Sequence, residues 1–168
     1  TAGAILVLVV LVALIGNLRA AFIAAGVIPI TLLLTFVGMR WFGLSGNLVS
    51  LGALDFGILI DGAVIVLDHC VRKIQERSTE LKRALSRSEV SETVAEATIE
   101  IRKAAGFGEL VIAVVFLPIF AFVGVEGKMF IPMAATFIIA LVAALALSFT
   151  FVPALASLVL AGNGRDKE

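Results

Sequence analysis

The sequence predicts an all-α fold: a polytopic transmembrane helical bundle with about five membrane helices plus one amphipathic helix on the cytoplasmic surface. Of the 168 residues, 61% are hydrophobic and 15% are charged, whereas a soluble domain has about 45–50% apolar and about 25% charged residues. Apolar runs of spanning length also alternate with short polar breaks. Composition and pattern together therefore argue against a soluble globular domain.

The polar breaks divide the chain into four parts. Residues 1–70 hold three predicted membrane helices, of which the third covers 48–70 and carries three aspartates. Residues 71–105 form a cytoplasmic amphipathic connector. Two more membrane helices are predicted in 106–162, and a polar tail follows at 163–168.

The distribution of basic residues predicts the orientation of these helices. Eight of the thirteen Lys and Arg residues lie between positions 72 and 103, and Arg19 and the tail fall on the same side of the predicted bundle. Only Arg40 and Lys128 fall on the other side. Cytoplasmic loops carry the excess of Lys and Arg, so the connector is predicted to be cytoplasmic.

The connector contains a predicted helix over residues 87–105. Ser86 and Glu89 have the spacing of a capping box. Apolar residues then recur at helical spacing, at Val90, Val94, Ala97 and Ile101. We expect an amphipathic helix on the cytoplasmic membrane face, and a solvated helical connector without lipid contact is an equal alternative.

The third apolar run carries Asp55, Asp61 and Asp68. An Asp at the centre of a membrane helix costs about 3 kcal/mol, and a large apolar residue returns about 0.5 kcal/mol. The twelve Leu, Ile, Val and Phe residues between positions 48 and 67 contribute on the order of −5 kcal/mol, against about +6 for two aspartates. A helix whose insertion into the membrane is so nearly neutral in free energy usually faces a protein interior or a water path. Its carboxylates then usually have a functional role.

The spacing of the aspartates places two of them on one helix face. Seven residues turn a helix by about 700°, so Asp61 and Asp68 coincide, while Asp55 lies about a third of a turn away. No Lys or Arg occurs inside a predicted span, so the carboxylates either meet a cation from elsewhere or are protonated. Both alternatives suit groups that bind and release protons. Glycines that permit close helix packing are interleaved with them, at Gly52, Gly57 and Gly62.

Other roles remain open for some of these residues. Asp68 is near the cytoplasmic end and is also suited to reach the headgroups, and His69 is expected to be an interfacial residue. The single cysteine argues against a Cys-based metal site, so the metal ligands stay unknown. No cofactor is predicted, and the chain has no phosphate-binding Gly-x-x-x-x-Gly-Lys-Ser/Thr loop.

Several motifs resemble the resistance–nodulation–division (RND) superfamily, in particular the cobalt–zinc–cadmium type of its heavy-metal efflux branch. Gly57-Ile-Leu-Ile-Asp61 followed by Asp68 is similar to the Gly-x-x-x-Asp-x-x-x-x-x-x-Glu/Asp motif of these pumps. The likeness extends over the whole chain, through Gly16-Asn-Leu-Arg-Ala20, Gly124-Val-Glu-Gly-Lys-Met-Phe-Ile-Pro-Met133 and Leu147-Ser-Phe-Thr-Phe-Val-Pro153.

The resemblance implies that the chain is transmembrane helices two to six of a longer pump, a secondary transporter and not an enzyme. It implies that Asp55, Asp61 and Asp68 relay the protons whose import drives export of metal cations. It further implies a homotrimer in the bacterial inner membrane, joined to a periplasmic adaptor and an outer-membrane channel, with no nucleic-acid partner.

Two departures from the family pattern refine these expectations. Asp68-His69 stands where the family commonly has Glu-Asn, which leaves it open whether Asp55 or Asp68 is the second proton carrier. Val49 and Leu59 stand where copper and silver exporters place methionines. Thioethers suit soft monovalent ions, so we expect zinc, cobalt, cadmium or nickel. The alternatives are an RND-type exporter of drugs or lipids and, for the isolated chain, a transport-inactive helical bundle.

Overall fold

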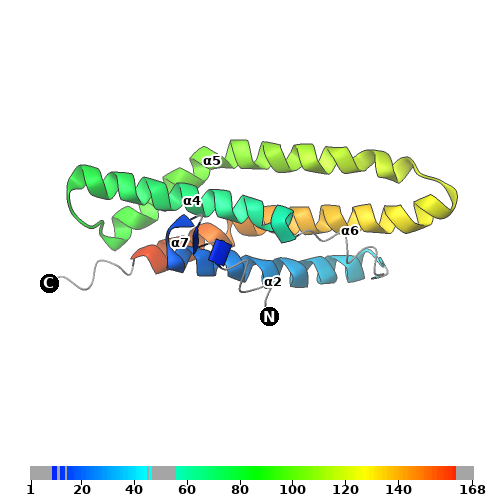
Figure 1. The fold of residues 1–168 in the computed structure, drawn as a ribbon, viewed down its shortest axis with the longest axis horizontal. Coiled ribbons are helices and arrows are strands. Elements are labelled where there is room, and N and C mark those ends of the chain that lie inside the picture. The colour runs from blue at the N-terminus through cyan, green and yellow to red at the C-terminus, as the bar shows by residue number, and fades with distance from the viewer. Residues whose placement is uncertain (1–8, 11, 14, 45, 47–55, 162–168) are drawn as a thin grey trace.

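The computed structural model describes residues 9–10, 12–13, 15–44, 46 and 56–161. These residues form helices that lie roughly along one long axis (Figure 1), and no strand occurs among them. The elements are α2 (Leu18–Trp41), α4 (Phe56–Leu81), α5 (Arg87–Phe116), the 3₁₀ helix η1 (Leu117–Ala121), α6 (Gly124–Phe149) and α7 (Phe151–Leu160). The predicted all-α fold is confirmed.

Three stretches of the described chain are long and apolar enough to cross a membrane: Leu18–Trp41, Arg87–Ala121 and Gly124–Leu160. They overlap with the predicted membrane helices in residues 1–70 and 106–162 and confirm a helical membrane bundle. Most of the first segment, and the third up to position 55, lie outside the described residues.

Helix α2 is preceded by a glycine and a capping asparagine, Gly16 and Asn17. Gly16 has a φ of +67°, a conformation that glycine adopts without steric cost. The Asn17 side chain then caps the helix by accepting hydrogen bonds from the backbone N–H groups of Arg19 and Ala20, at 3.0 and 3.4 Å. Pro29 lies inside the helix, where it removes one backbone hydrogen bond. Thr31, one turn after Val27, is fully buried and donates to the carbonyl of Val27 at 2.8 Å.

Helices α4 and α5 form a long antiparallel hairpin (Figure 1). Helix α4 does not end with the apolar run at Cys70 but continues to Leu81, after which Lys82 adopts a left-handed φ of 51°. Helix α5 begins at Arg87 as predicted, and the capping box between Ser86 and Glu89 is present. It continues beyond position 105 to Phe116, so the amphipathic part and the apolar part are one continuous helix.

Two prolines interrupt the later apolar segments. Helix α5 gives way to η1, which has Pro118 near its start. The predicted fifth membrane helix is divided into α6 and α7 at Thr150. Pro153 has no N–H to donate to the Phe149 carbonyl, and its ring clashes with that carbonyl. Thr150 ends α6, and its backbone N–H donates to the carbonyls of Ala146 and Leu147 at 3.1 and 3.3 Å.

The core consists mainly of small side chains, which allow the helices to approach closely. Its fully buried members include Ala20 and Ala24 of α2, Ala63 of α4, Ala97 of α5 and Ala156 of α7. Helix α4 packs against α2, α5, α6 and α7. This central position of α4 determines where its polar side chains can lie.

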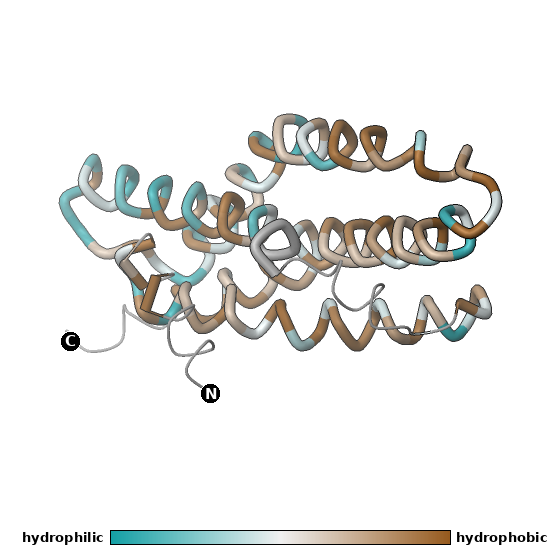
Figure 2. The backbone as a smooth tube through the Cα atoms, turned by 45° about the vertical axis from the view of Figure 1, so that its right-hand side comes forward, coloured by the Kyte–Doolittle hydropathy of each residue, from teal (hydrophilic) through white to brown (hydrophobic). Residues whose placement is uncertain are grey.

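The two ends of the bundle differ in polarity. The start of α2, the turn between α4 and α5, and the end of α7 gather at one end (Figure 1). That end of the hairpin is hydrophilic, while most of α2 and α6 is hydrophobic (Figure 2). At the opposite end, Trp41 closes α2 and is 86% exposed. This arrangement agrees with the orientation predicted from the basic residues.

Candidate functional site

Helix α4 presents Asp61 and Asp68 on one side. It is unbroken from Phe56 to Leu81, so the expected rotation of about 700° between the two residues holds. Asp61 is exposed and Asp68 is half-buried, whereas the neighbouring residues Gly62, Ala63, Val66 and Leu67 are buried against the bundle. The two carboxylates therefore lie along the edge of the face that α4 turns away from the core. Asp55 lies outside the described residues.

Asp68 has a cationic partner on its own helix. Its Oδ2 atom lies 3.3 Å from Nη2 of Arg72, and 42% of the Asp68 side chain is exposed. Such an i,i+4 pair contributes about 0.3–0.5 kcal/mol. From the sequence, a cation for the aspartates was expected from outside the predicted span, with protonation as the alternative. Arg72 lies two residues beyond that span and comes within reach of Asp68 because α4 continues past Cys70.

Asp61 differs from Asp68 in its partners. Among the residues that the structure describes, no Lys, Arg or His lies within ion-pair distance of Asp61. Its position two turns before Asp68 places it about 10 Å deeper along the helix axis.

His69 connects α4 to α5. Its Nε2 atom lies 3.4 Å from Oε2 of Glu100, but without the alignment of a hydrogen bond. Lys73 approaches the same oxygen, with Nζ at 2.8 Å. The hydrogen bond from Lys73 is the main cause that lowers the pKa of Glu100, and it raises the pKa of Lys73.

Further ion pairs close the polar end of the hairpin. Arg77 of α4 lies 2.9 Å from Glu96 of α5, and Arg83 of the turn lies 2.7 Å from Glu89. The hydrogen bond from Arg83, followed by the one from the Ser86 backbone N–H, lowers the pKa of Glu89 from 4.5 to about 2. The hairpin is thus held by charge pairs at its exposed end and by apolar packing nearer the bundle.

Glu109 is a further acidic residue near Asp61, and no role for it was predicted from the sequence. It lies in the apolar part of α5 and is half-buried. Its Oε1 atom occupies the space where Gly62, the residue after Asp61, has no side chain. Its Oε2 atom is shielded from solvent and has no hydrogen-bond partner. The sequence does contain a signal for this site, because Glu109 is the single Glu within the apolar run 107–123.

The described residues contain no group of three or more His, Cys, Asp and Glu side chains suited to hold a metal ion. Cys70 is buried, with Sγ 3.9 Å from Thr98 Oγ1 and 4.0 Å from the Val94 carbonyl. It serves the packing of α4 on α5.

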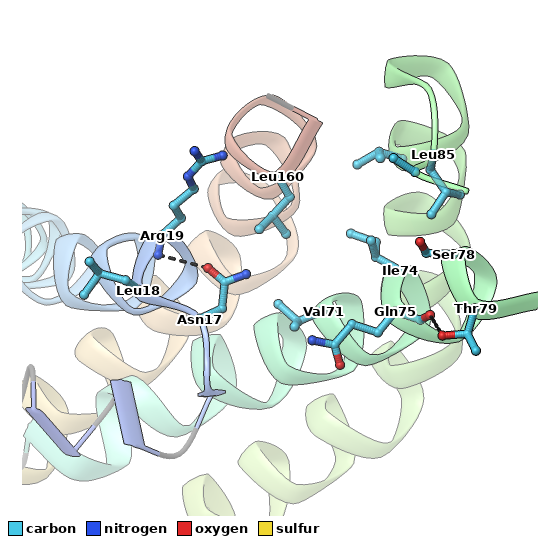
Figure 3. A pocket seen from close by; sticks show the side chains of 12 residues that line it. Asn17, Leu18, Arg19, Val71, Ile74, Gln75, Ser78, Thr79, Leu85 and Leu160 are labelled. Atoms are coloured by element: carbon cyan, nitrogen blue, oxygen red, sulfur yellow. Dashed lines mark hydrogen bonds between the residues drawn. The ribbon is translucent and has the colours of Figure 1, made fainter. Parts of the chain in front are cut away.

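A cavity lies at the polar end of the bundle, and its lining does not include Asp61 or Asp68. It encloses about 580 Å³ between the start of α2, the later half of α4 and the end of α7 (Figure 3). Arg19 and Gln75 are among its polar lining residues, and Leu160 closes it from α7. It has no lining carboxylate, thiol or imidazole, so its lining offers no proton carrier.

Comparison of the sequence with known proteins identifies relatives that match nearly the whole chain. The cobalt-zinc-cadmium resistance protein CzcA of Cupriavidus metallidurans is 50% identical over 166 residues, which cover 99% of this chain and 16% of CzcA. The nickel-cobalt-cadmium resistance protein NccA of Alcaligenes xylosoxydans xylosoxydans is 49% identical, over 99% of this chain and 15% of NccA. The chain therefore spans only a small part of the curated relatives it matches.

A solved structure and a family model extend the likeness to the fold. The crystal structure of a heavy metal efflux pump, crystal form I, superposes with a TM-score of 0.73 and 37% identity, over 94% of this chain and 14% of that one. The model of the AcrB/AcrD/AcrF family matches residues 1–168. With the motifs around Asp61, these matches show that the chain belongs to the AcrB/AcrD/AcrF family of the RND superfamily, in its heavy-metal efflux branch.

Proposed function

We propose that this chain is the proton-carrying membrane segment of an antiporter that exports divalent metal cations in exchange for protons. Asp61 is its principal proton carrier. The observation that carries the proposal is a carboxylate on a membrane helix with no cation within ion-pair distance among the described residues. Such a group gains or loses its charge when its surroundings alternate between wet and dry.

Asp68 has a different place in this proposal. It pairs with Arg72 at 3.3 Å and lies about 10 Å nearer the polar end of α4 than Asp61, which suits a group that passes protons to the cytoplasmic water. Asp55 is proposed as the outer member of the relay because it lies in the same apolar run, six residues before Asp61. The relay then extends over about 20 Å of helix.

The proposed cargo is a divalent ion of the zinc, cobalt, cadmium or nickel group. Two relatives that match nearly the whole chain are named for resistance to cobalt, zinc and cadmium and to nickel, cobalt and cadmium. Metal ligands are not assigned to residues of this chain. Each imported proton supplies about 2.3 kcal/mol per 100 mV of membrane potential.

The proposed setting is a homotrimer in a bacterial inner membrane, coupled to a periplasmic adaptor and an outer-membrane channel. The charge distribution supports an orientation with the α4–α5 turn in the cytoplasm. In that orientation, the predicted connector at residues 71–105, which includes the polar end of the α4–α5 hairpin, lies on the cytoplasmic side.

The test uses the full-length pump in a metal-sensitive host. Asp61→Asn removes the proton-binding group at nearly constant volume, and we expect loss of metal resistance with the protein still present in the membrane. Glu126→Gln is the matched control, because Glu126 is exposed in the first turn of α6. Resistance that survives Asp61→Asn contradicts the proposal. Export of organic compounds without any response to divalent metals instead identifies a pump for drugs or lipids.

A further inference from the structure

Glu109 is placed where helices α4, α5 and α6 meet. It comes from α5, its Oε1 lies against Gly62 of α4, and Ser148 of α6 borders the same space. A Cβ atom at Gly62 would lie 3.1 Å from Ser148 Oγ and would collide with Glu109. The absence of a side chain at position 62 is therefore what admits this carboxyl group beside Asp61.

Among the described residues, no cation lies within ion-pair distance of Glu109. Its Oε2 atom is excluded from solvent without a hydrogen-bond partner. Ser148 donates its hydroxyl hydrogen to the Ala144 carbonyl at 2.8 Å, so it does not serve Glu109. A buried carboxylate oxygen without donor or cation is costly, and a proton on the carboxyl group removes that cost.

Among the described residues of α4, Asp61 is the ionisable residue adjacent to Gly62, against which Glu109 Oε1 lies. The other helix in contact at this point, α6, contributes the neutral Ser148. The ionisable residues of α6, Glu126 and Lys128, are in its first two turns, about 30 Å away along the helix. Two neighbouring carboxyl groups without a cation do not ionise together, because their like charges repel.

We propose that Glu109 is a second proton-carrying residue that shares one proton with Asp61 during transport, an inference that rests on the proposed antiport function. The proton leaves a carboxyl oxygen of Asp61 and binds a carboxylate oxygen of Glu109, so Asp61 becomes ionised as Glu109 becomes neutral. The pair keeps one proton and one negative charge throughout. Release of the proton from Glu109 and arrival of a new one at Asp61 reset the pair.

The experiment compares variants of the full-length pump reconstituted in proteoliposomes. Proton-driven zinc transport is measured across a range of pH for wild type, Glu109→Gln, Glu109→Asp and Ser148→Ala. We expect Glu109→Gln to lower the rate by about tenfold or more, in line with losing one proton-transfer group, and to change the pH profile. Glu109→Asp should restore much of the rate, and Ser148→Ala should behave as wild type.

Two results overturn the inference. One is a wild-type rate and pH profile in Glu109→Gln. The other is an equal loss in Glu109→Gln and Glu109→Asp together with a lowered Tm, which assigns Glu109 a purely structural role. Failure of the antiport proposal is distinct, because in that case Asp61→Asn itself leaves zinc transport unchanged whatever the Glu109 variants do.

Discussion

At the scale of single residues, Asp61 and Asp68 are chemically identical and differ through their neighbours. Asp68 lies one turn from Arg72 and pairs with it at 3.3 Å. Asp61 is deeper in the apolar run. The next residue, Gly62, packs against the carboxyl group of Glu109. Spacing alone predicts the shared helix face of the two aspartates, but only the packing of three helices distinguishes their environments.

The capping residue Ser86 offers a direct test of the hairpin turn. Its Oγ accepts from the Glu89 N–H at 3.4 Å, and its own N–H donates to Glu89 Oε2 at 2.7 Å. Ser86→Ala removes the first of these bonds, and we expect a loss of about 1 kcal/mol of stability. Thermal unfolding in detergent measures this loss, and Ser86→Thr should be close to wild type. An unchanged Tm in Ser86→Ala contradicts the assigned cap.

The low pKa of Glu89 predicts an acid-sensitive hairpin turn. Arg83 and the Ser86 N–H lower this pKa from 4.5 to about 2 in the folded chain, so the carboxylate stabilises the turn above pH 4.5. That contribution is lost as the pH falls from about 4.5 to about 2. Hydrogen exchange at the start of α5 should show the loss, and Glu89→Gln should remove its pH dependence. Equal acid sensitivity in both proteins would show that another group is responsible.

At the scale of helices, the sequence predicts where elements begin better than where they end. The capping box at Ser86 and Glu89 identifies the start of α5, because it is a local interaction. The end of the apolar run at Cys70 does not identify the end of α4, since a helix can leave a membrane without unfolding. Residues 71–81 remain helical because ion pairs such as Lys73–Glu100 replace lipid contact.

The break at Thr150 was not predicted either. The apolar run at 130–160 is uninterrupted in composition, and prolines in membrane helices are often tolerated. Pro132 is accommodated within α6, whereas Pro153 coincides with a division of the helix. Hydropathy does not separate these two cases, because the difference depends on which neighbouring groups satisfy the freed carbonyls.

The contact of α4, α5 and α6 at Gly62 predicts a steric effect. Gly62→Ala places a methyl group against Glu109 and 3.1 Å from Ser148 Oγ, and overpacking of this kind costs about 1–3 kcal/mol. We expect a lowered Tm in detergent. Gly106→Ala in α5 is the matched control, because a Cβ there meets nothing within 4 Å, and the better helix propensity of Ala should raise stability by up to about 1 kcal/mol. Equal effects of both substitutions would argue against close packing at Gly62.

At the scale of the whole molecule, the described helices leave the face that carries Asp61 uncovered. Asp61 is exposed at the surface of the described helices, and the apolar part of α5 is exposed as well, with Phe107 at 68% and Val115 at 67%. In a membrane, a carboxylate in this position requires a further protein surface or a water path. The sequence predicts the fold class and a helical membrane bundle, but what faces Asp61 depends on groups outside the described helices.

This open face predicts that the isolated chain is inactive. Reconstituted alone in liposomes, it should insert as a helical bundle and show no coupled flux of protons and zinc, because one side of the relay is not enclosed. A pH-sensitive dye and a zinc indicator inside the vesicles measure the two fluxes. Coupled flux through the isolated chain would show that the relay needs no further surface.

The central claim is that proton binding at Asp61 is linked to metal movement, and its most direct test is proton flux in proteoliposomes of the full-length pump. An imposed zinc gradient should move protons in the opposite direction in the wild-type pump and in Glu126→Gln, and should move none in Asp61→Asn. Zinc-driven proton flux that persists in Asp61→Asn at the wild-type rate would contradict the account.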